Sequence, residues 1–315
     1  MRRVLFVFGA IALLAGAHAS LGAQTAPDLI TDVRAAIADQ NFARGESMVR
    51  QHQSIHGMTP ESAAALSWLA RGTLAAKQLD KAAQYAGETY RLAVAALKTR
   101  RLDDDAHLQT ALGAAIEVEA LVRAARGERS EAVYFLRREL DAYRDTTIHM
   151  RIQKNINLLS LEGQPAPPLA VGEQLGRRVP TFDDLKGKVV VLFFWAHWCP
   201  DCKIQGPILE SLLQKYRSQG LAVVAPTQRF GYAVEGQPAT PDDEMVHILK
   251  VRDAYYGFLR DEPVPVSDVN HKRYGVSSTP TLALVDRGGI VRVYHPGRMT
   301  EQELEAAIQP LLRNN

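Results

Sequence analysis

The sequence predicts a protein of two domains, an all-α domain of helical hairpins followed by an α/β domain. Three observations lead to this prediction. The chain has 315 residues, which is more than a typical single domain contains. From residue 27 to about residue 163 it is rich in alanine, nearly free of proline and helical in period. After the proline-rich residues 164–168, apolar runs that fit strands alternate with helical segments, as in an α/β layer.

The N-terminus has the pattern of a secretion signal. Arg2-Arg3 precede the apolar residues 4–17, and Ala17-His18-Ala19 fits the A-x-A cleavage rule. The apolar segment is short for a membrane span. We therefore predict residues 1–19 to be a cleaved signal peptide, with cleavage after Ala19 or, alternatively, after Ala23. An uncleaved N-terminal membrane anchor is the other alternative, and both predict a periplasmic or otherwise exported protein.

The charge balance gives no support to two classes of partner. Removal of residues 1–19 takes away two arginines and no acidic residue, which leaves 35 acidic residues and an equal number of basic ones. A neutral chain gives no reason to expect binding to nucleic acid or to an anionic membrane surface.

The helical domain is predicted at residues 24–163. Thr59 is a suitable N-cap because Pro60 follows it at the first helical position, and Gly57 and Gly127 are suitable stops. The predicted helices span residues 28–39, 41–55, 60–79, 80–99, 105–126, 128–144 and 148–161.

The pairing of these helices suggests a helical-hairpin array. Trp68-Leu69-Ala70-Arg71-Gly72 and Ala111-Leu112-Gly113 resemble the start of a tetratricopeptide (TPR) repeat, although their spacing is about ten residues longer than that of the repeat. We predict a TPR-like domain, with an irregular helical bundle as the alternative. Such a domain would dock a partner protein or position the second domain; a packed helical cap without a ligand site is the simpler interpretation.

The α/β domain is predicted at residues 164–313. Residues 189–194 are continuously apolar and mostly β-branched or aromatic, which is typical of a strand buried on both faces. A helix follows, because Ile204, Ile208 and Leu212 recur every fourth residue. Further along we predict a strand at 221–225, a loop at 226–239, a helix at 241–260, an extended segment at 264–266, a helical turn at 268–274, a hairpin of strands 282–285 and 290–294, and a final helix opened by a capping box at 300–303.

Both cysteines of the chain lie at the junction of the first strand and its helix. Cys199 and Cys202 are three residues apart, and a bridge that closes so short a loop adds little stability. A disulfide scaffold would use more cysteines. Pro200 suits the first helical turn, so Cys199 lies at the positive end of a helix, where a thiolate is stabilised. The pair therefore predicts redox chemistry.

Several segments together resemble one family. Trp195-Ala196-His197-Trp198-Cys199-Pro200-Asp201-Cys202-Lys203, with Pro207 after it, resembles the active-site segment of the TlpA/ResA-like thiol–disulfide oxidoreductases, which have a thioredoxin fold. Leu185-Lys186-Gly187-Lys188, Thr279-Pro280-Thr281 and Gly288-Gly289 resemble other parts of that family. The resemblance covers residues 164–313 and says nothing about residues 24–163.

The resemblance implies a role for each matching residue. Cys199 would be the attacking thiolate and Cys202 the resolving thiol of a redox-active disulfide. Pro280 would follow a cis peptide bond, and the backbone of Thr279 would pair with a substrate peptide beside Trp198. We predict no cofactor. The predicted supporting residues are Trp195, Pro200, Asp201 and Lys203.

Three departures from the family pattern affect the chemistry. Phe193 stands where thioredoxins bury an acid, and Gln205 stands where relatives often carry a glutamate. Neither can exchange a proton, so any general base for Cys202 must come from elsewhere. The Asp201 carboxylate should disfavour a nearby thiolate, whereas the helix terminus and Lys203 should favour it. We predict a moderately reducing couple.

The histidines give weaker signals. His197 is close to Cys199 in sequence, and we interpret it as an exposed surface residue at the rim of the site. His247, His271 and His295 show no ligand spacing such as H-x-x-x-H, so no metal site is predicted.

The sequence as a whole predicts an exported thiol–disulfide oxidoreductase that reduces disulfides of client proteins. Its partners would be those disulfide-containing clients and a membrane or envelope thiol electron donor. Two alternatives remain open: a dithiol oxidase of the same fold, and a helical-repeat adaptor whose second domain mainly binds partners.

Overall fold

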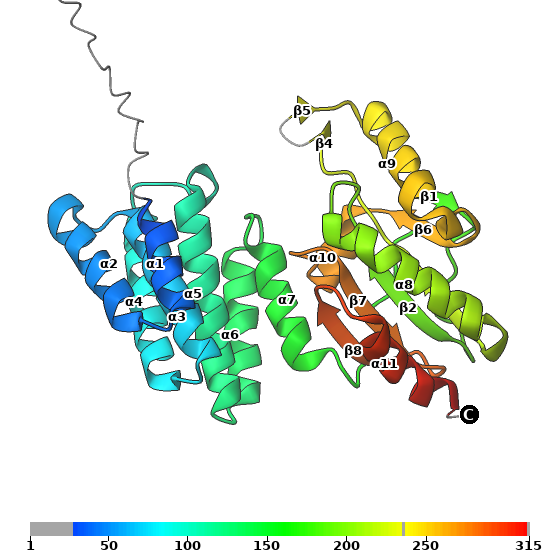
Figure 1. Ribbon diagram of the computed structural model, residues 1–315, viewed down its shortest axis with the longest axis horizontal. Coiled ribbons are helices and arrows are strands. Elements are labelled where there is room, and N and C mark those ends of the chain that lie inside the picture. The colour runs from blue at the N-terminus through cyan, green and yellow to red at the C-terminus, as the bar shows by residue number, and fades with distance from the viewer. Residues whose placement is uncertain (1–27, 235–236, 314–315) are drawn as a thin grey trace, which may run out of the picture.

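The structure is a computed structural model that describes residues 28–234 and 237–313. The predicted signal peptide at residues 1–19 lies outside the described residues. The first half of the described chain is helical (Figure 1), and its α-helices match the predicted ones in order and number, which confirms the all-α part of the fold class. They are α1 (Leu29–Ala38), α2 (Phe42–His56), α3 (Pro60–Ala75), α4 (Leu79–Ala96), α5 (Ala106–Ala125), α6 (Arg129–Ala142) and α7 (His149–Ser160).

The helices begin where their capping residues predict. Thr59 Oγ1 accepts a hydrogen bond from Ser62 N at 3.1 Å, and Thr59 N donates to Ser62 Oγ at 3.2 Å, so α3 opens with a capping box. Fully buried alanines on α3 allow its neighbours to approach closely. Within the described residues, no helix combines the length and the apolar character needed to cross a membrane. The TPR-like organisation of these helices stays a prediction.

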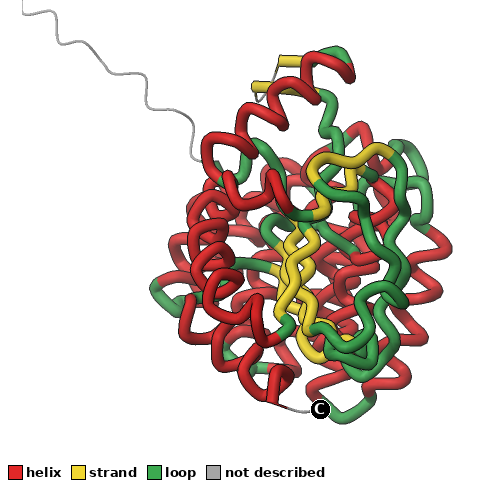
Figure 2. The backbone as a smooth tube through the Cα atoms, turned by 90° about the vertical axis from the view of Figure 1, so that its right-hand side faces the viewer, coloured by secondary structure: helices red, strands yellow, loops and turns green. Residues whose placement is uncertain are grey.

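The second half contains a four-stranded sheet covered by helices, seen edge-on in Figure 2. The strand order is β3-β2-β7-β8, with β2 parallel to β3 and antiparallel to β7. This mixture of one parallel pair and an antiparallel hairpin confirms the predicted α/β layer. The strands are β2 (Val189–Phe194), β3 (Leu221–Val224), β7 (Thr281–Val285) and β8 (Val291–Pro296), and the helices are α8 (Pro200–Tyr216), α9 (Pro241–Tyr255), α10 (Asp268–Tyr274) and α11 (Glu301–Arg313).

Strand β2 is buried on both faces, as its unbroken apolar run predicts. Its odd-numbered residues, such as Val191 and Phe193, belong to a core with apolar residues of α8, α9 and α11. Its even-numbered residues, such as Leu192 and Phe194, belong to a second core that includes Tyr274 at the end of α10. The period of two along a strand thus assigns each residue to one layer.

Three segments differ from the prediction. Residues 226–239, expected as a loop, contain a short hairpin of β4 (Tyr232–Val234) and β5 (Gln237–Pro238). Strand β1 (Glu173–Gly176) was not predicted and pairs with β6 (Pro263–Val266), the expected extended segment. The predicted helix 241–260 ends at Tyr255 and continues as a 3-10 turn at Gly257–Asp261. Short strands of this kind form through pairing with distant partners, so their own sequences carry little signal.

Helix α7 joins the two halves. Gly275, at the end of α10, lies against the backbone of Gln153 and Lys154 in α7, and Asn157 Nδ2 donates to Arg273 O at 3.4 Å.

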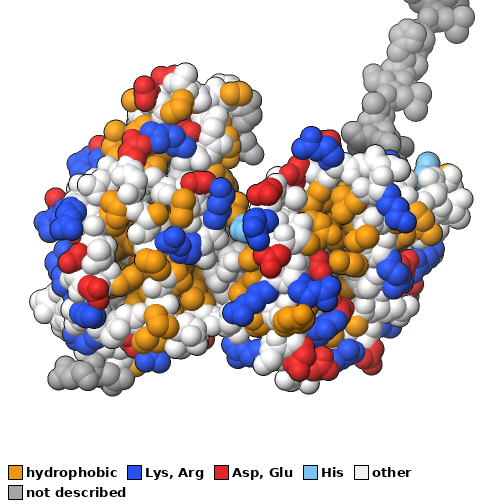
Figure 3. All heavy atoms as spheres, turned by 180° about the vertical axis from the view of Figure 1, so that it is seen from behind, with side chains coloured by type: hydrophobic (Ala, Val, Ile, Leu, Met, Phe, Trp, Pro, Cys, Tyr) orange, Lys and Arg blue, Asp and Glu red, His pale blue; other side chains and the backbone are white. Residues whose placement is uncertain are grey.

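On the face seen in Figure 3, a hollow separates the two lobes and Lys and Arg side chains lie beside it. The domain limits 24–163 and 164–313 stay a proposal.

Candidate active site

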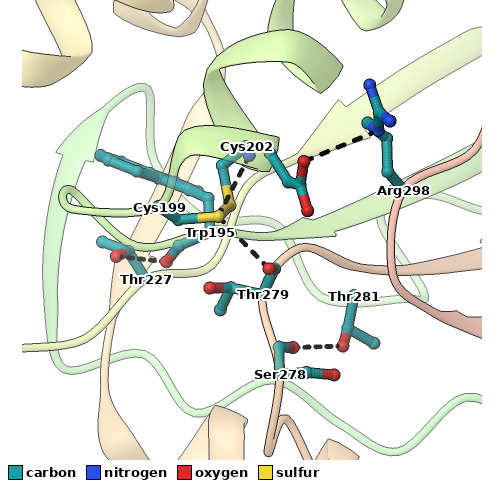
Figure 4. Close-up of a disulfide and its surroundings, with 9 residues drawn as sticks. Trp195, Cys199, Cys202, Thr227, Ser278, Thr279, Thr281 and Arg298 are labelled. Atoms are coloured by element: carbon teal, nitrogen blue, oxygen red, sulfur yellow. Dashed lines mark hydrogen bonds and ion pairs between the residues drawn. A yellow bond between two sulfur atoms is a disulfide. The ribbon is translucent and has the colours of Figure 1, made fainter. Parts of the chain in front are cut away.

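The two cysteines lie where β2 leads into α8, and a disulfide joins them (Figure 4). Cys199 is the N-cap of α8, and its Sγ accepts a hydrogen bond from Cys202 N at 3.0 Å. Pro200 occupies the first position of the helix. A backbone N–H and the positive end of the helix thus face the Cys199 sulfur, a geometry that suits a stabilised thiolate.

The loop before β7 faces the disulfide from the other side. The peptide bond between Thr279 and Pro280 is cis, and Thr279 O lies 3.3 Å from Cys199 Sγ. Thr279 Oγ1 is buried and has no hydrogen-bond partner among the described residues. The loop before β7 therefore brings a backbone carbonyl to the sulfur (Figure 4).

The sulfurs are less accessible than the sequence suggested. Cys199 is 1% exposed and Cys202 is 0% exposed, whereas a helix terminus alone predicts an available nucleophile. Trp198 is the large apolar residue of the motif that reaches the surface, with 41% of its area exposed. A partner that approaches Cys199 therefore meets the side chains around it first.

The two tryptophans have different environments. Trp195 is fully buried; its Nε1 donates to Ala225 O at 3.1 Å, and its carbonyl oxygen accepts a hydrogen bond from Thr227 Oγ1 at 2.8 Å. Thr227 was not predicted, because it lies 32 residues away in the chain. Trp198 lies edge-on to the ring of Phe230 at 5.6 Å. Trp195 thus anchors the cysteine motif to residues 225–227 in the interior, and Trp198 forms part of the protein surface.

The charges near the motif are arranged differently from the prediction. Arg298, which the sequence gave no reason to select, lies 3.8 Å from the exposed Asp201 carboxylate. Lys203 Nζ lies 4.4 Å from the centre of the Tyr255 ring, so its ammonium group packs on α9. Arg298 thus offsets part of the Asp201 charge that would oppose a thiolate at Cys199.

This ion pair leads to a first prediction. Replacement of Arg298 by glutamine should lower the reduction potential of the cysteine pair by roughly 5–20 mV, because an exposed ion pair contributes roughly 0.2–1 kcal/mol. The direction follows because an uncompensated Asp201 disfavours the thiolate and hence the reduced form. Equilibration in thiol buffers measures the potential. Asp201→Asn should raise the potential. Shifts of both variants in the same direction would contradict the proposed compensation.

The positions where the family pattern carries acids are neutral here, and each has a packing role. Phe193 is fully buried with its ring edge-on to Tyr256 at 6.0 Å. Gln205 is also buried, and its Oε1 accepts a hydrogen bond from Met299 N at 2.8 Å. Burial, with a smaller contribution from Tyr255, raises the pKa of the Tyr256 hydroxyl. None of the three groups is a base at neutral pH.

The prediction that His197 is an exposed surface residue is wrong. His197 is 1% exposed and packs against the rings of Phe230 at 5.5 Å and His247 at 5.3 Å. Burial lowers its pKa, with Glu244 opposing this effect. The reason is the position of residues 230–232: the Glu244 carboxylate accepts hydrogen bonds from Phe230 N and Gly231 N, and the rings of Phe230 and Tyr232 cover His197.

His271 leads to a prediction about stability and pH. It is fully buried beside Phe194, and burial lowers its pKa to about 4, against smaller opposing effects of the Ser267 backbone and of Asp268. As the pH falls, His271 therefore takes up a proton in the unfolded chain before it does so in the folded protein. The contribution of neutral His271 to the free energy of unfolding is fully present above pH 6.5 and decreases by about 2–3 kcal/mol between pH 6.5 and pH 4.5. Urea unfolding at several pH values measures this; a His271→Leu variant should show a shallower dependence, and an unchanged slope would contradict the assignment.

The other histidines do not converge on the cysteines. His271 lies in the core and His247 beside His197, while His295 Nε2 lies 3.3 Å from Arg298 O. In the part of the chain that the structure describes, no group of three or more His, Cys, Asp or Glu side chains could hold a metal ion.

Comparisons with known proteins agree with this geometry. Residues 161–308 match the family model named Redoxin. The thioredoxin-like protein YneN of Bacillus subtilis is 32% identical over 145 residues, which span 46% of this chain and 76% of YneN. The thiol–disulfide oxidoreductase ResA of the same organism is 30% identical, over 44% of this chain and 70% of ResA. Among solved structures, the pneumococcal exposed lipoprotein thioredoxin Etrx1 of Streptococcus pneumoniae is 26% identical, with a TM-score of 0.35, and the match covers 45% of this chain and all (100%) of Etrx1.

Proposed function

Because the chain belongs to the redoxin family of thioredoxin-like thiol–disulfide oxidoreductases, we propose that it is an exported enzyme that reduces disulfides of client proteins with Cys199 and Cys202. The observation that carries this proposal is the position of the cysteine pair. Cys199 Sγ lies at the start of α8, 3.0 Å from a helix N–H and 3.3 Å from Thr279 O. The first turn of α8 and the loop that we propose to bind the client thus face the same sulfur.

The catalytic cycle uses the two sulfurs in turn. With both cysteines reduced, the Cys199 thiolate attacks one sulfur of a client disulfide, forms a mixed disulfide and releases the second client sulfur as a thiolate, which takes up a proton. Cys202 then loses its proton and attacks Cys199 Sγ. The bond between Cys199 and the client breaks, and the client sulfur that Cys199 had attacked leaves as a thiolate and takes up a proton. Two electrons have passed to the client, and the enzyme holds the 199–202 disulfide.

The surrounding residues support the first step by positioning the client. The Thr279 backbone, next to the cis bond before Pro280, is placed to pair with an extended client segment. Trp198 offers an exposed aromatic face beside the sulfur. Trp195 anchors the motif in the interior and Pro200 begins the helix. Asp201 and Arg298 set the local charge, and Lys203 packs on Tyr255.

The cycle requires a source of electrons. Because the 199–202 disulfide must be reduced before the next turnover, a second thiol protein has to attack it. The proposed signal peptide at residues 1–19 would place the enzyme in the periplasm or an equivalent compartment, so this donor would be a membrane or envelope thiol protein.

The reduction potential of the cysteine pair tests the direction of the proposed reaction. Mature protein is equilibrated in thiol buffers, and the free thiols are trapped with an alkylating reagent. A value near that of thioredoxin, about −270 mV, is the expected result. A value near −120 mV would instead make the protein a dithiol oxidase. The absence of a reversible couple would overturn both enzymatic functions and favour the adaptor.

A further inference from the structure

A cleft between the two domains lies next to the active-site loop. It has a volume of about 480 Å³ and is open to solvent. Residues of α3, α5 and α7 line one side of it, and Ser277 and Ser278 line the other. Ser278 directly precedes Thr279, whose carbonyl oxygen lies 3.3 Å from Cys199 Sγ. An extended chain spans at most about 3.6 Å per residue. The part of the loop that lines the cleft therefore lies within about 7 Å, measured along the chain, of the Thr279 carbonyl beside Cys199 Sγ.

The helical side of the cleft carries an excess of positive charge. Arg71, Arg151 and Lys154 line it together with a single carboxylate, that of Glu117. Glu117 Oε2 accepts hydrogen bonds from Arg151 Nε at 3.0 Å and from Lys154 Nζ at 2.9 Å. Burial alone would raise the pKa of Glu117, but these two cations outweigh it and lower the pKa to about 2. One negative charge is therefore shared by two cations, and Arg71 is not neutralised.

Arg71 is poorly compensated where it lies. Its Nε is buried and has no hydrogen-bond partner among the described residues, and its guanidinium stacks on Trp68 at 4.6 Å. Burial, reinforced by the charges of Arg151 and Arg34, lowers the pKa of Arg71 to about 10, so it remains a cation at neutral pH. A guanidinium with unused donors beside an open cleft is suited to a carboxylate, which it can bind through two parallel hydrogen bonds.

We propose that this cleft binds an acidic segment of the client protein and selects clients whose reactive cysteine lies close to Asp or Glu residues. The inference rests on the proposed function, because it names the client class of the same active site. A client strand that pairs with Thr279 and continues past Ser278 and Ser277 enters the cleft after about two residues. Its carboxylates then meet Arg71 and the two cations around Glu117. The helical domain thus contributes specificity to a reaction that the other domain performs.

The test compares two peptide disulfides that differ only in their flanks, one with Asp-Asp-Glu beside the cysteine and the other with Asn-Asn-Gln. Reduced full-length mature protein should reduce the acidic peptide about tenfold faster at low salt, as expected for a charge-assisted hydrogen bond. Arg71→Gln should remove most of this advantage. Equal rates for the two peptides with the unaltered protein would overturn the proposal.

Two further variants separate the cleft from general charge attraction. Arg34 also stacks on Trp68, at 4.5 Å, but does not line the cleft, so Arg34→Gln is the matched control and should keep the preference. Loss of the preference in Arg34→Gln to the same extent would overturn the proposal. Ser277 is exposed, so Ser277→Glu should fold normally and abolish the preference even if Arg71→Gln proves unstable.

Equilibrium binding distinguishes a failure of the cleft from a failure of the proposed function. A cysteine-free fluorescent peptide with the acidic flank is titrated with the protein and followed by anisotropy. If no variant reduces either peptide, the proposed reductase function fails; tighter binding of the acidic probe that depends on Arg71 would still support the cleft. Equal binding of the acidic and neutral probes would overturn it, whatever the redox result.

Discussion

Replacement of Cys199 by serine is expected to reduce thiol–disulfide exchange to the uncatalysed level. A serine hydroxyl at the start of α8 keeps the hydrogen bond from Cys202 N but is not a nucleophile toward disulfides. We do not expect Cys202 to replace it, because Cys199 is the N-cap of α8 and its sulfur is the one that lies against Thr279 O. The rate of reduction of a peptide disulfide measures the loss, and more than about a tenth of the original rate in Cys199→Ser would contradict the assigned roles.

The matched control is Cys202→Ser, which should behave differently. This variant keeps the attacking sulfur and lacks the resolving one, so it should accumulate a mixed disulfide with its client instead of releasing product. The covalent complex is visible as a mass increase that a reducing agent reverses. The absence of a complex in Cys202→Ser would contradict attack by Cys199. A complex in Cys199→Ser would show that Cys202 attacks the client.

Replacement of Gly275 by alanine is expected to lower stability strongly. Gly275 ends α10 with φ at 61°, and a Cβ there would overlap Lys154 N and lie 2.6 Å from Gln153 C. These are backbone atoms of α7, which cannot move without shifting the helix. We expect a loss of about 2–5 kcal/mol, from the left-handed conformation together with the steric overlap. Chemical unfolding measures the loss, and limited proteolysis near residues 161–170 reports whether the domains separate.

The control for this variant is Gly127→Ala. Gly127 also has a positive φ, of 89°, but a Cβ there would meet nothing within 4 Å. Its substitution therefore costs only the backbone strain, about 1–2 kcal/mol. If Gly275→Ala is no more destabilising than Gly127→Ala, the contact between α7 and α10 does not determine how the two domains sit. The preference for acidic peptides should be lost in Gly275→Ala wherever the variant still folds, because Ser277 and Arg71 would no longer lie across one cleft.

Most of the secondary structure could be predicted because its causes are local. The capping pair of Thr59 and Ser62, the proline at position 60 and the helical repeat of apolar residues act over three or four positions. The unbroken apolar run of β2 and the cysteine at the following helix start also form one continuous segment. The missed strands β1, β4 and β5 are short, and they exist only through pairing.

The candidate site divides in the same way. The cysteine pair could be predicted as a candidate redox site because Cys199, Pro200 and Cys202 form one helical turn, which is a continuous piece of sequence. The surroundings of that turn depend on tertiary packing. Packing brings Arg298 to Asp201, covers His197 with Phe230 and Tyr232 and sets Arg71 across a cleft from Ser277. Each of these contacts joins residues far apart in the chain; their approach depends on how whole helices and sheets pack, which no local pattern encodes.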